Sequence, residues 1–208
     1  MEFDAVILAG GRSSRLGGVP KSGLEYDGAT LLERALQAAR GARAAVVVGP
    51  PQQGLRPGTL TAREDPPFAG PAAAIAAGLA ALAGRPAAPG SAAETAPWTL
   101  VLACDMPHAR DAVAVLIREL EGSPGAEGAM AISADGRRQP LLGLYSTAAL
   151  EREVAAAHDS GGLVNASVFG LLARLELLPV PVPSGSTDDV DTWEDAAALG
   201  IDGPRRTS

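Results

Sequence analysis

A segment that combines glycines with three cationic side chains is the most promising place for chemistry in this chain. It occupies residues 8–21, reads LAGGRSSRLGGVPK, and follows an apolar run. Glycines let the backbone approach a ligand and direct N–H groups at its oxygens, while Arg12, Arg15 and Lys21 add positive charge to an acidic chain. A solvated glycine-rich turn is the alternative. We favour a polyphosphate-binding loop, because the strand context and the cations occur together.

The spacing in this loop excludes two common phosphate-binding motifs. A Walker A loop needs Gly-Lys followed by Ser or Thr, but Lys21 follows Pro20. The dinucleotide fingerprint needs Gly-x-Gly-x-x-Gly, which Gly10-Gly11 does not supply. An NAD-dependent oxidoreductase is therefore disfavoured.

Two groups of acidic residues are candidates for a divalent metal. Asp105 follows a buried apolar run, where a carboxylate is costly unless it is paired, and Mg²⁺ bridging to phosphates would be a suitable partner. Asp189 and Asp191 alternate around Val190, so both carboxylates can face one side of an extended segment. The alternative for each group is that an Asp favours the start of the next helix. For the second group the two interpretations remain open.

Two further segments have weaker patterns. A buried carboxylate in residues 64–71 could accept hydrogen bonds from the N1–H and amino group of guanine, although Asp65-Pro66-Pro67 is also typical of a turn. Arg137 and Arg138 precede an apolar run and could bind an acceptor phosphate, or could simply lie in a solvated turn.

Strand patterns alternate with helix patterns along the chain, and this alternation predicts an α/β fold with a mostly parallel sheet. These strands and helices must position the candidate residues. Strands are expected at residues 4–9, 44–48, 59–63, 98–103, 130–133, 141–145 and 177–182, the last at a sheet edge. Helices are expected at residues 30–40, 71–82, 111–120, 147–157, 167–175 and 192–199, two of them beginning with capping boxes at Thr30 and Thr192. Ligands of such sheets bind beyond the carboxyl ends of the strands, where residues 10–21 and Asp105 are expected.

Length and composition predict one domain at residues 1–201, with a mobile loop at residues 84–97 and a flexible tail at residues 202–208. The net charge of −7 argues against nonspecific nucleic-acid binding. The single cysteine, Cys104, excludes an intrachain disulfide and a cysteine-cluster zinc site. No apolar stretch reaches the roughly 20 residues of a membrane span. We expect a soluble cytoplasmic protein, either a monomer or a weak homo-oligomer.

The motifs together resemble the MobA-like molybdenum cofactor guanylyltransferases of the NTP-transferase superfamily. The resemblance runs from Ala5 to about Leu199, and its most specific element is the run at residues 8–21. Supporting elements are the segments around Asp65, Cys104-Asp105-Met106-Pro107, Arg138-Gln139-Pro140-Leu141 and Asp189-Val190-Asp191-Thr192. The chain has Asp-Val-Asp where this family usually has Asn-Val-Asn, which adds negative charge beside the expected metal.

This resemblance implies a single three-layer α/β/α domain of Rossmann-like type. It also implies a nucleotidyl-transfer reaction. In that reaction GMP passes from GTP to the phosphate of molybdopterin, the molybdenum cofactor pterin, and pyrophosphate is released. It implies catalytic roles for Arg15 on the β- and γ-phosphates, for Lys21 on the α-phosphate and for Asp105, with Asp105 and Asp191 as Mg²⁺ ligands. The implied GTP-binding residues are Leu8, Ala9, Gly10, Gly11, Lys21, Asp65 and Asp105.

Two alternatives remain at this point. A related transferase would keep the fold but use CTP or another phosphorylated acceptor, such as a sugar phosphate or a phospholactate-like compound. A noncatalytic nucleotide-binding protein would keep the fold without the reaction. The joint presence of Arg15, Lys21 and Asp105 argues against the second alternative.

Overall fold

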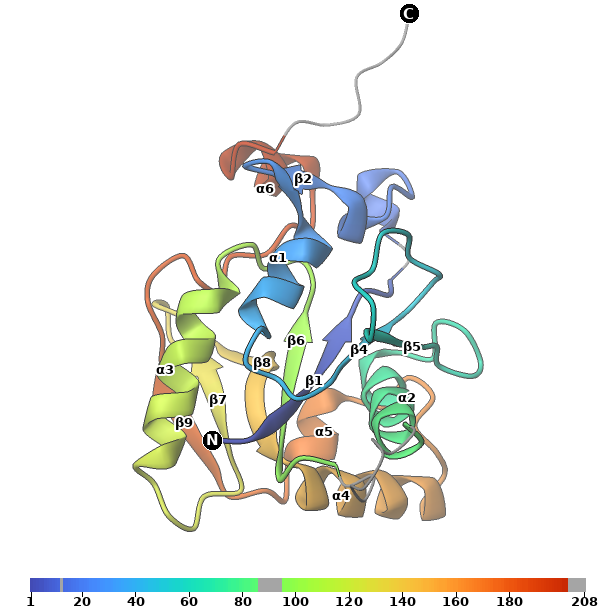
Figure 1. Ribbon diagram of the computed structural model, residues 1–208, viewed down its shortest axis with the longest axis vertical. Coiled ribbons are helices and arrows are strands. Elements are labelled where there is room, and N and C mark those ends of the chain that lie inside the picture. Colours follow the sequence, from blue (N-terminus) through green and yellow to red (C-terminus); the bar gives the residue numbers. More distant parts are fainter. Residues whose placement is uncertain (12, 86–94, 202–208) are drawn as a thin grey trace, which may run out of the picture.

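The computed structural model describes residues 1–11, 13–85 and 95–201, and its centre is a seven-stranded sheet (Figure 1). The strands, in the spatial order β5-β4-β1-β6-β8-β7-β9, are Leu60–Ala62, Ala45–Val48, Phe3–Leu8, Trp98–Ala103, Arg138–Ser146, Gly128–Ile132 and Leu177–Pro181. All neighbouring pairs are parallel except those of β8, which runs antiparallel to both β6 and β7. The expectation of a mostly parallel sheet is confirmed.

Helices cover both faces of this sheet and complete three layers (Figure 1). They are α1 Leu31–Ala38, α2 Pro71–Ala83, α3 Ala109–Glu121, α4 Thr147–Asp159, α5 Val168–Leu172 and α6 Trp193–Ala198. Along β1, Ala5 and Ile7 join the core under α1 and α3, whereas Val6 and Leu8 join the core under α2, α4 and α5. This alternation explains why the strand is apolar at nearly every position, since both of its faces are buried.

A third, smaller apolar cluster lies beyond the carboxyl ends of the strands. Two 3₁₀ turns, η1 Ser14–Leu16 and η2 Lys21–Gly23, and a short hairpin, β2 Glu25–Tyr26 with β3 Ala29–Thr30, follow β1. Leu16 and Leu24 from this region pack with Val190 and Ala196 from the C-terminal part of the chain. The cluster therefore holds residues near position 190 against the glycine-rich loop, although about 170 residues separate them in sequence.

Most expected elements are confirmed within a few residues. Thr30 and Thr192 both form complete capping boxes, with Glu33 and Asp195 respectively, and Leu177–Pro181 is an edge strand. The strand expected at residues 141–145 begins earlier, because Arg138 and Gln139 already pair with β7, across a register shift after Met130. The alternative of a solvated turn therefore does not apply to Arg138. The expected helix at residues 167–175 is shorter, with α5 limited to Val168–Leu172.

Two expected segments lie wholly or mostly outside the residues that the structure describes. The tail at residues 202–208 and most of the loop at residues 84–97 lie outside the described residues. Within the described part of the chain, no helix is both long and apolar enough to cross a membrane.

Candidate active site

The glycine-rich loop leaves β1 at the carboxyl edge of the sheet and passes close to the end of β4. A Cβ atom on Gly49 would lie 2.8 Å from the backbone C of Ala9 and N of Gly10, so this crossing requires glycine. Gly11 has a φ of 136°, a conformation that side chains rarely adopt. Gly10 and Gly11 are both exposed, which leaves the backbone at the start of the loop open to a phosphate. Arg12, one of the three cations expected here, lies outside the described residues.

Lys21 joins two aspartates that are far apart in the sequence. Its Nζ donates to Asp105 Oδ2 at 2.9 Å and also to Asp191 Oδ1, and only 20% of its side chain is exposed. Burial alone would lower the pKa of Lys21, but the charge of Asp105 and the hydrogen bonds to both carboxylates outweigh burial and raise it. Lys21 therefore stays protonated and provides a fixed positive charge.

Asp189 completes a group of three carboxylates with Asp105 and Asp191. One oxygen of each lies within 4.8 Å of the others, while Val190 between them is fully buried in the third cluster. The expectation that Asp189 and Asp191 face one side is confirmed. Partial burial, followed by the charges of Asp105 and Asp191, raises the pKa of Asp189. Such clustering of anionic oxygens is what a hard divalent cation stabilises.

The helix-capping alternatives for these aspartates do not hold. Helix α3 begins after His108, which forms no side-chain cap, and Asp105 lies outside that helix start. The cap of α6 is Thr192 with Asp195, so the Asp191 carboxylate is left to pair with Lys21 and with Arg15, whose Nη1 lies 3.4 Å from Oδ2. Both carboxylates are thus directed at cations rather than at helix N–H groups.

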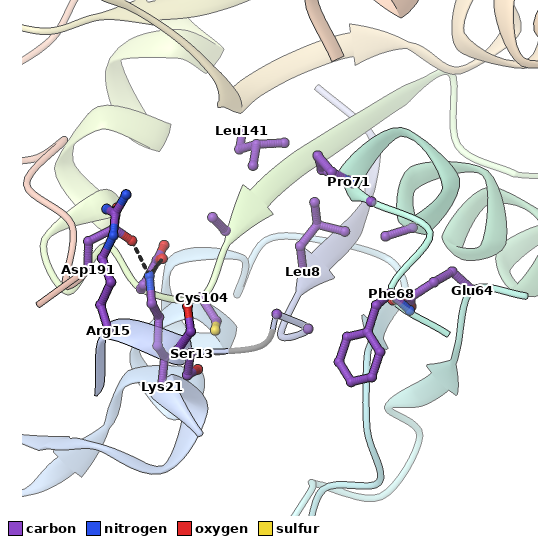
Figure 2. Close-up of a pocket in the computed structure, with 17 residues that line it drawn as sticks. Leu8, Ser13, Arg15, Lys21, Glu64, Phe68, Pro71, Cys104, Leu141 and Asp191 are labelled. Carbon is purple, nitrogen blue, oxygen red and sulfur yellow. Dashed lines mark hydrogen bonds and ion pairs between the residues drawn. The ribbon is translucent and has the colours of Figure 1, made fainter. Parts of the chain in front are cut away.

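These charged residues line a cavity of 510 Å³ at the carboxyl edge of the sheet. Figure 2 shows Arg15, Lys21 and Asp191 on one side of it and Glu64 and Phe68 on the other. Of the residues expected to bind nucleotide or metal, those lining this cavity are Leu8, Gly10, Gly11, Arg15, Lys21, Asp105 and Asp191. Ala9 instead lines an adjoining cavity of 360 Å³ that shares Gly10, Lys21 and Phe68 with the first.

The structure places Glu64 in the cavity, not the expected Asp65. Asp65 is exposed and lines a separate apolar groove between α2 and α4. Glu64 is 7% exposed; its Oε1 accepts from the N–H of Phe68 at 3.0 Å, and its buried Oε2 has no hydrogen-bond partner among the described residues. The adjacent Glu-Asp pair was visible in the sequence, but which carboxylate turns inward depends on the register after β5.

The structure also shows where the single cysteine and the pair of adjacent arginines lie. Cys104 lies at the cavity but is buried, and burial followed by the charge of Asp105 raises the pKa of its thiol, which makes it a poor nucleophile. Arg137 and Arg138 do not reach the first cavity; both line a second cavity, of 550 Å³. Of the two, Arg137 forms an ion pair with Asp135 at 2.6 Å.

Comparisons with known proteins identify a family and a fold. The model of the MobA-like NTP transferase domain matches residues 5–174. The molybdenum cofactor guanylyltransferase of Shewanella sp. (strain ANA-3) is 27% identical over 166 residues, 77% of each chain. Similar structures include 2-C-methyl-D-erythritol 4-phosphate cytidylyltransferase from Thermus thermophilus (TM-score 0.64, 21% identity, covering 96% of this chain and 97% of that one). The manganese complex of Rv0371C from Mycobacterium tuberculosis H37Rv is also similar (TM-score 0.60, 20% identity, 96% and 98% covered).

Proposed function

The chain belongs to the MobA-like NTP transferase family, and on that premise we propose that it transfers GMP from GTP to the phosphate of molybdopterin and releases pyrophosphate. The observation that carries the proposal is the position of Lys21, held between Asp105 and Asp191 beside the accessible backbone of the glycine-rich loop. Transfer of a nucleotidyl group needs this combination, because cations must offset the repulsion between two anionic reactants.

We propose Mg²⁺ as the cofactor, held by Asp105 and Asp191 with Asp189 close by. The three carboxylates fit such an ion, since their oxygens lie within 4.8 Å of one another and repel without a cation. The metal would neutralise charge on the triphosphate and polarise the α-phosphoryl group. The manganese complex of the M. tuberculosis neighbour is consistent with a divalent cation in this fold.

In the proposed reaction an oxygen of the acceptor phosphate attacks the α-phosphorus of GTP. A new P–O bond forms, the bond from the α-phosphorus to the bridging oxygen breaks, and pyrophosphate leaves with the electron pair. The attacking oxygen is anionic near pH 7, so no general base is needed. Lys21 would stabilise charge on the α-phosphate, and Arg15, 70% exposed, can follow the β- and γ-phosphates.

Glu64 supports guanine as the base. With the triphosphate near Lys21, the nucleobase would extend toward the side of the cavity that holds Glu64 and Phe68. The Oε2 of Glu64 is a buried acceptor that has no partner among the described residues and needs a donor. Guanine offers two donors on one edge, N1–H and its amino group, whereas cytosine presents the acceptor N3 beside a single amino group. A carboxylate therefore favours guanine.

Release of pyrophosphate tests the proposed function directly. The purified protein is incubated with Mg²⁺ and each of the four NTPs, with and without molybdopterin. Release with GTP only when molybdopterin is present supports both substrates. Release with CTP would keep the reaction class and replace the base, as the similarity to a cytidylyltransferase allows. Binding of GTP without release of pyrophosphate in the presence of any phosphorylated acceptor would instead indicate a noncatalytic nucleotide-binding protein.

A further inference from the structure

A second cavity reaches the acid cluster through Asp189. Its volume is 550 Å³, and it is formed by the turn between β7 and β8, by α5, and by the segment before Asp191. Two stretches of chain reach both cavities. Along β8, Pro140 lines the second cavity and Leu141 the first; in the acidic segment, Asp189 lines the second and Asp191 the first. The cavities are therefore neighbours that share the carboxylate wall.

Arg138 gives this second cavity an anion-binding group. Its side chain is exposed to the cavity and, within the described ranges, forms no hydrogen bond or ion pair. The neighbouring Arg137 differs, because its Nε donates to Asp135 at 2.6 Å. Arg138 and Asp189 line the same cavity from separate segments. The space between the cation and the carboxylate wall is open to a ligand.

Phe169 gives the cavity an apolar surface. In α5 the neighbouring Val168, Leu171 and Leu172 are buried in the core, whereas 49% of Phe169 is exposed and the ring borders the cavity. An aromatic face exposed at the edge of a cavity can stack against a planar ligand. Beside it lie the polar side chains of Gln139, Ser184 and Asp188. A flat heteroaromatic ring with polar edges matches this combination.

We propose that the second cavity binds the acceptor, with Arg138 on its phosphomonoester and Phe169 against its heteroaromatic ring. This inference rests on the proposed function, because it assigns the acceptor side of that reaction. It explains how the two substrates avoid mutual repulsion until they meet: each phosphate group has its own cation, Lys21 or Arg138. The shared wall of Asp105, Asp189 and Asp191 then lies between them, where a metal would join the two.

Binding of two pterins tests the assignment without turnover. A pterin that carries a phosphomonoester and the same pterin without it are titrated by fluorescence anisotropy, with Mg²⁺ and α,β-methylene-GTP present. The Arg138→Gln variant should bind the phosphorylated pterin about tenfold more weakly or worse, since a charge-assisted hydrogen bond is lost. It should bind the unphosphorylated pterin as the wild type does. The Phe169→Leu variant should weaken binding of both.

Arg137→Gln is the matched control, because it removes the adjacent, already paired arginine. An equal loss in Arg137→Gln and Arg138→Gln would mean that only net charge matters and would overturn the assignment. So would wild-type affinity that ignores the phosphate, or probe binding that occurs only when α,β-methylene-GTP is left out, which would place the probe in the first cavity. All variants should keep the wild-type affinity for GTP.

Turnover separates this inference from the proposed function. If the wild type releases pyrophosphate and Arg138→Gln leaves the KM for the acceptor unchanged, the second cavity is not the acceptor site and the reaction stands. If no acceptor supports pyrophosphate release but the phosphorylated pterin binds in an Arg138-dependent way, the proposed function fails and the pterin site stands.

Discussion

Lys21 is the residue on which charge balance at the site depends. It is the one group in contact with both Asp105 and Asp191 in the described part of the chain, and it stays protonated because both carboxylates raise its pKa. The Lys21→Met variant keeps the length of the side chain and removes the charge. We expect kcat to fall about 100-fold or more and the Kd for GTP to rise only a few-fold, because the charge acts mainly where negative charge develops.

Steady-state kinetics and GTP titration separate these two effects. Arg15→Met is a useful comparison, because Arg15 is far more exposed and pairs with Asp191 alone among the described carboxylates; its loss should affect KM for GTP more than kcat. Equal losses of binding and turnover in Lys21→Met would show that Lys21 acts only as a binding residue.

Glu64 and Asp65 offer a matched pair for base specificity. Glu64→Gln replaces an acceptor oxygen by an amide, which faces the donors of guanine with donors of its own. We expect kcat/KM for GTP to fall about 100-fold, with the preference over CTP largely lost, because buried polar groups left unpaired dominate such discrimination. The same ratio should change less than about twofold in Asp65→Asn, since that carboxylate is exposed outside the cavity. A larger effect of Asp65→Asn than of Glu64→Gln would show that Asp65, not Glu64, recognises the base.

For single residues, the sequence predicted which residue types form the site better than it predicted where each side chain points. Lys21, Asp105 and Asp191 meet as expected, because strand ends and a glycine-rich loop place them at one edge of the sheet. Glu64 was missed in favour of Asp65, since adjacent side chains in an irregular segment point in opposite directions and no periodicity says which turns inward. Asp189 was noted, but its approach to Asp105 depends on a long-range contact.

Among the elements, α2 contacts the sheet at a glycine that leaves no room for a side chain. A Cβ on Gly78 would lie 2.6 Å from Val6 Cγ1 and 3.2 Å from Val48 Cγ2, both side chains of buried strands. Alanine is favoured over glycine in a helix by about 1 kcal/mol, but overpacking a rigid core costs about 1–3 kcal/mol. The net of these opposing effects should lower the free energy of unfolding of Gly78→Ala by up to about 2 kcal/mol in urea denaturation.

The control for this substitution is Gly170→Ala in α5. There the added Cβ would meet only Ser167 Cβ, at an ordinary 3.7 Å. Stability should stay unchanged or rise slightly, as helix propensity predicts. A Gly78→Ala variant as stable as Gly170→Ala would show that α2 can move away from the sheet.

The capping box of α1 makes the stability of that helix depend on pH. Glu33 accepts from the backbone N–H of Thr30 at 2.7 Å and from its hydroxyl, and these bonds lower the pKa of Glu33. A lowered folded-state pKa contributes stability above the unfolded value, about 4.3, and this contribution is lost as the pH falls through the folded pKa. Wild type should therefore exceed Glu33→Gln in stability at pH 7, and the difference should shrink below about pH 4. Thermal melts across this range measure it.

Strands and helix starts with a strong local sequence pattern were predictable. Features that depend on pairing between distant strands were not. Buried runs such as Trp98–Ala103 and capping boxes at Thr30 and Thr192 contain their own signals. The direction of β8 does not, because antiparallel insertion between β6 and β7 is decided by pairing across the sheet. The same pairing turns Arg138 from a loop residue into the first residue of a strand that borders the second cavity.

Across the whole molecule, the side of the site that holds Lys21 and the carboxylates is assembled from three distant parts of the chain. The glycine-rich loop, the end of β6 and the segment at Asp189–Asp191 are held together by the third apolar cluster and by the Val190 N–H, which donates to the Asp105 carbonyl at 3.2 Å. A ligand that contacts all three parts binds only the folded protein. Its binding free energy therefore adds directly to the stability of the fold.

This coupling predicts a cooperative rise in Tm. GTP and Mg²⁺ together, at about 100 times the apparent Kd, should add about 3 kcal/mol and raise Tm by roughly 6–12 °C for a chain of this length. Mg²⁺ alone should do much less, because Lys21 already offsets part of the negative charge of Asp105 and Asp191. CTP with Mg²⁺ should fall between the two if Glu64 selects guanine. In Asp191→Asn the rise with both ligands should shrink toward that of GTP alone. A shift that is additive in wild type would mean that nucleotide and metal bind at separate sites, contrary to a metal held between the carboxylates and the triphosphate.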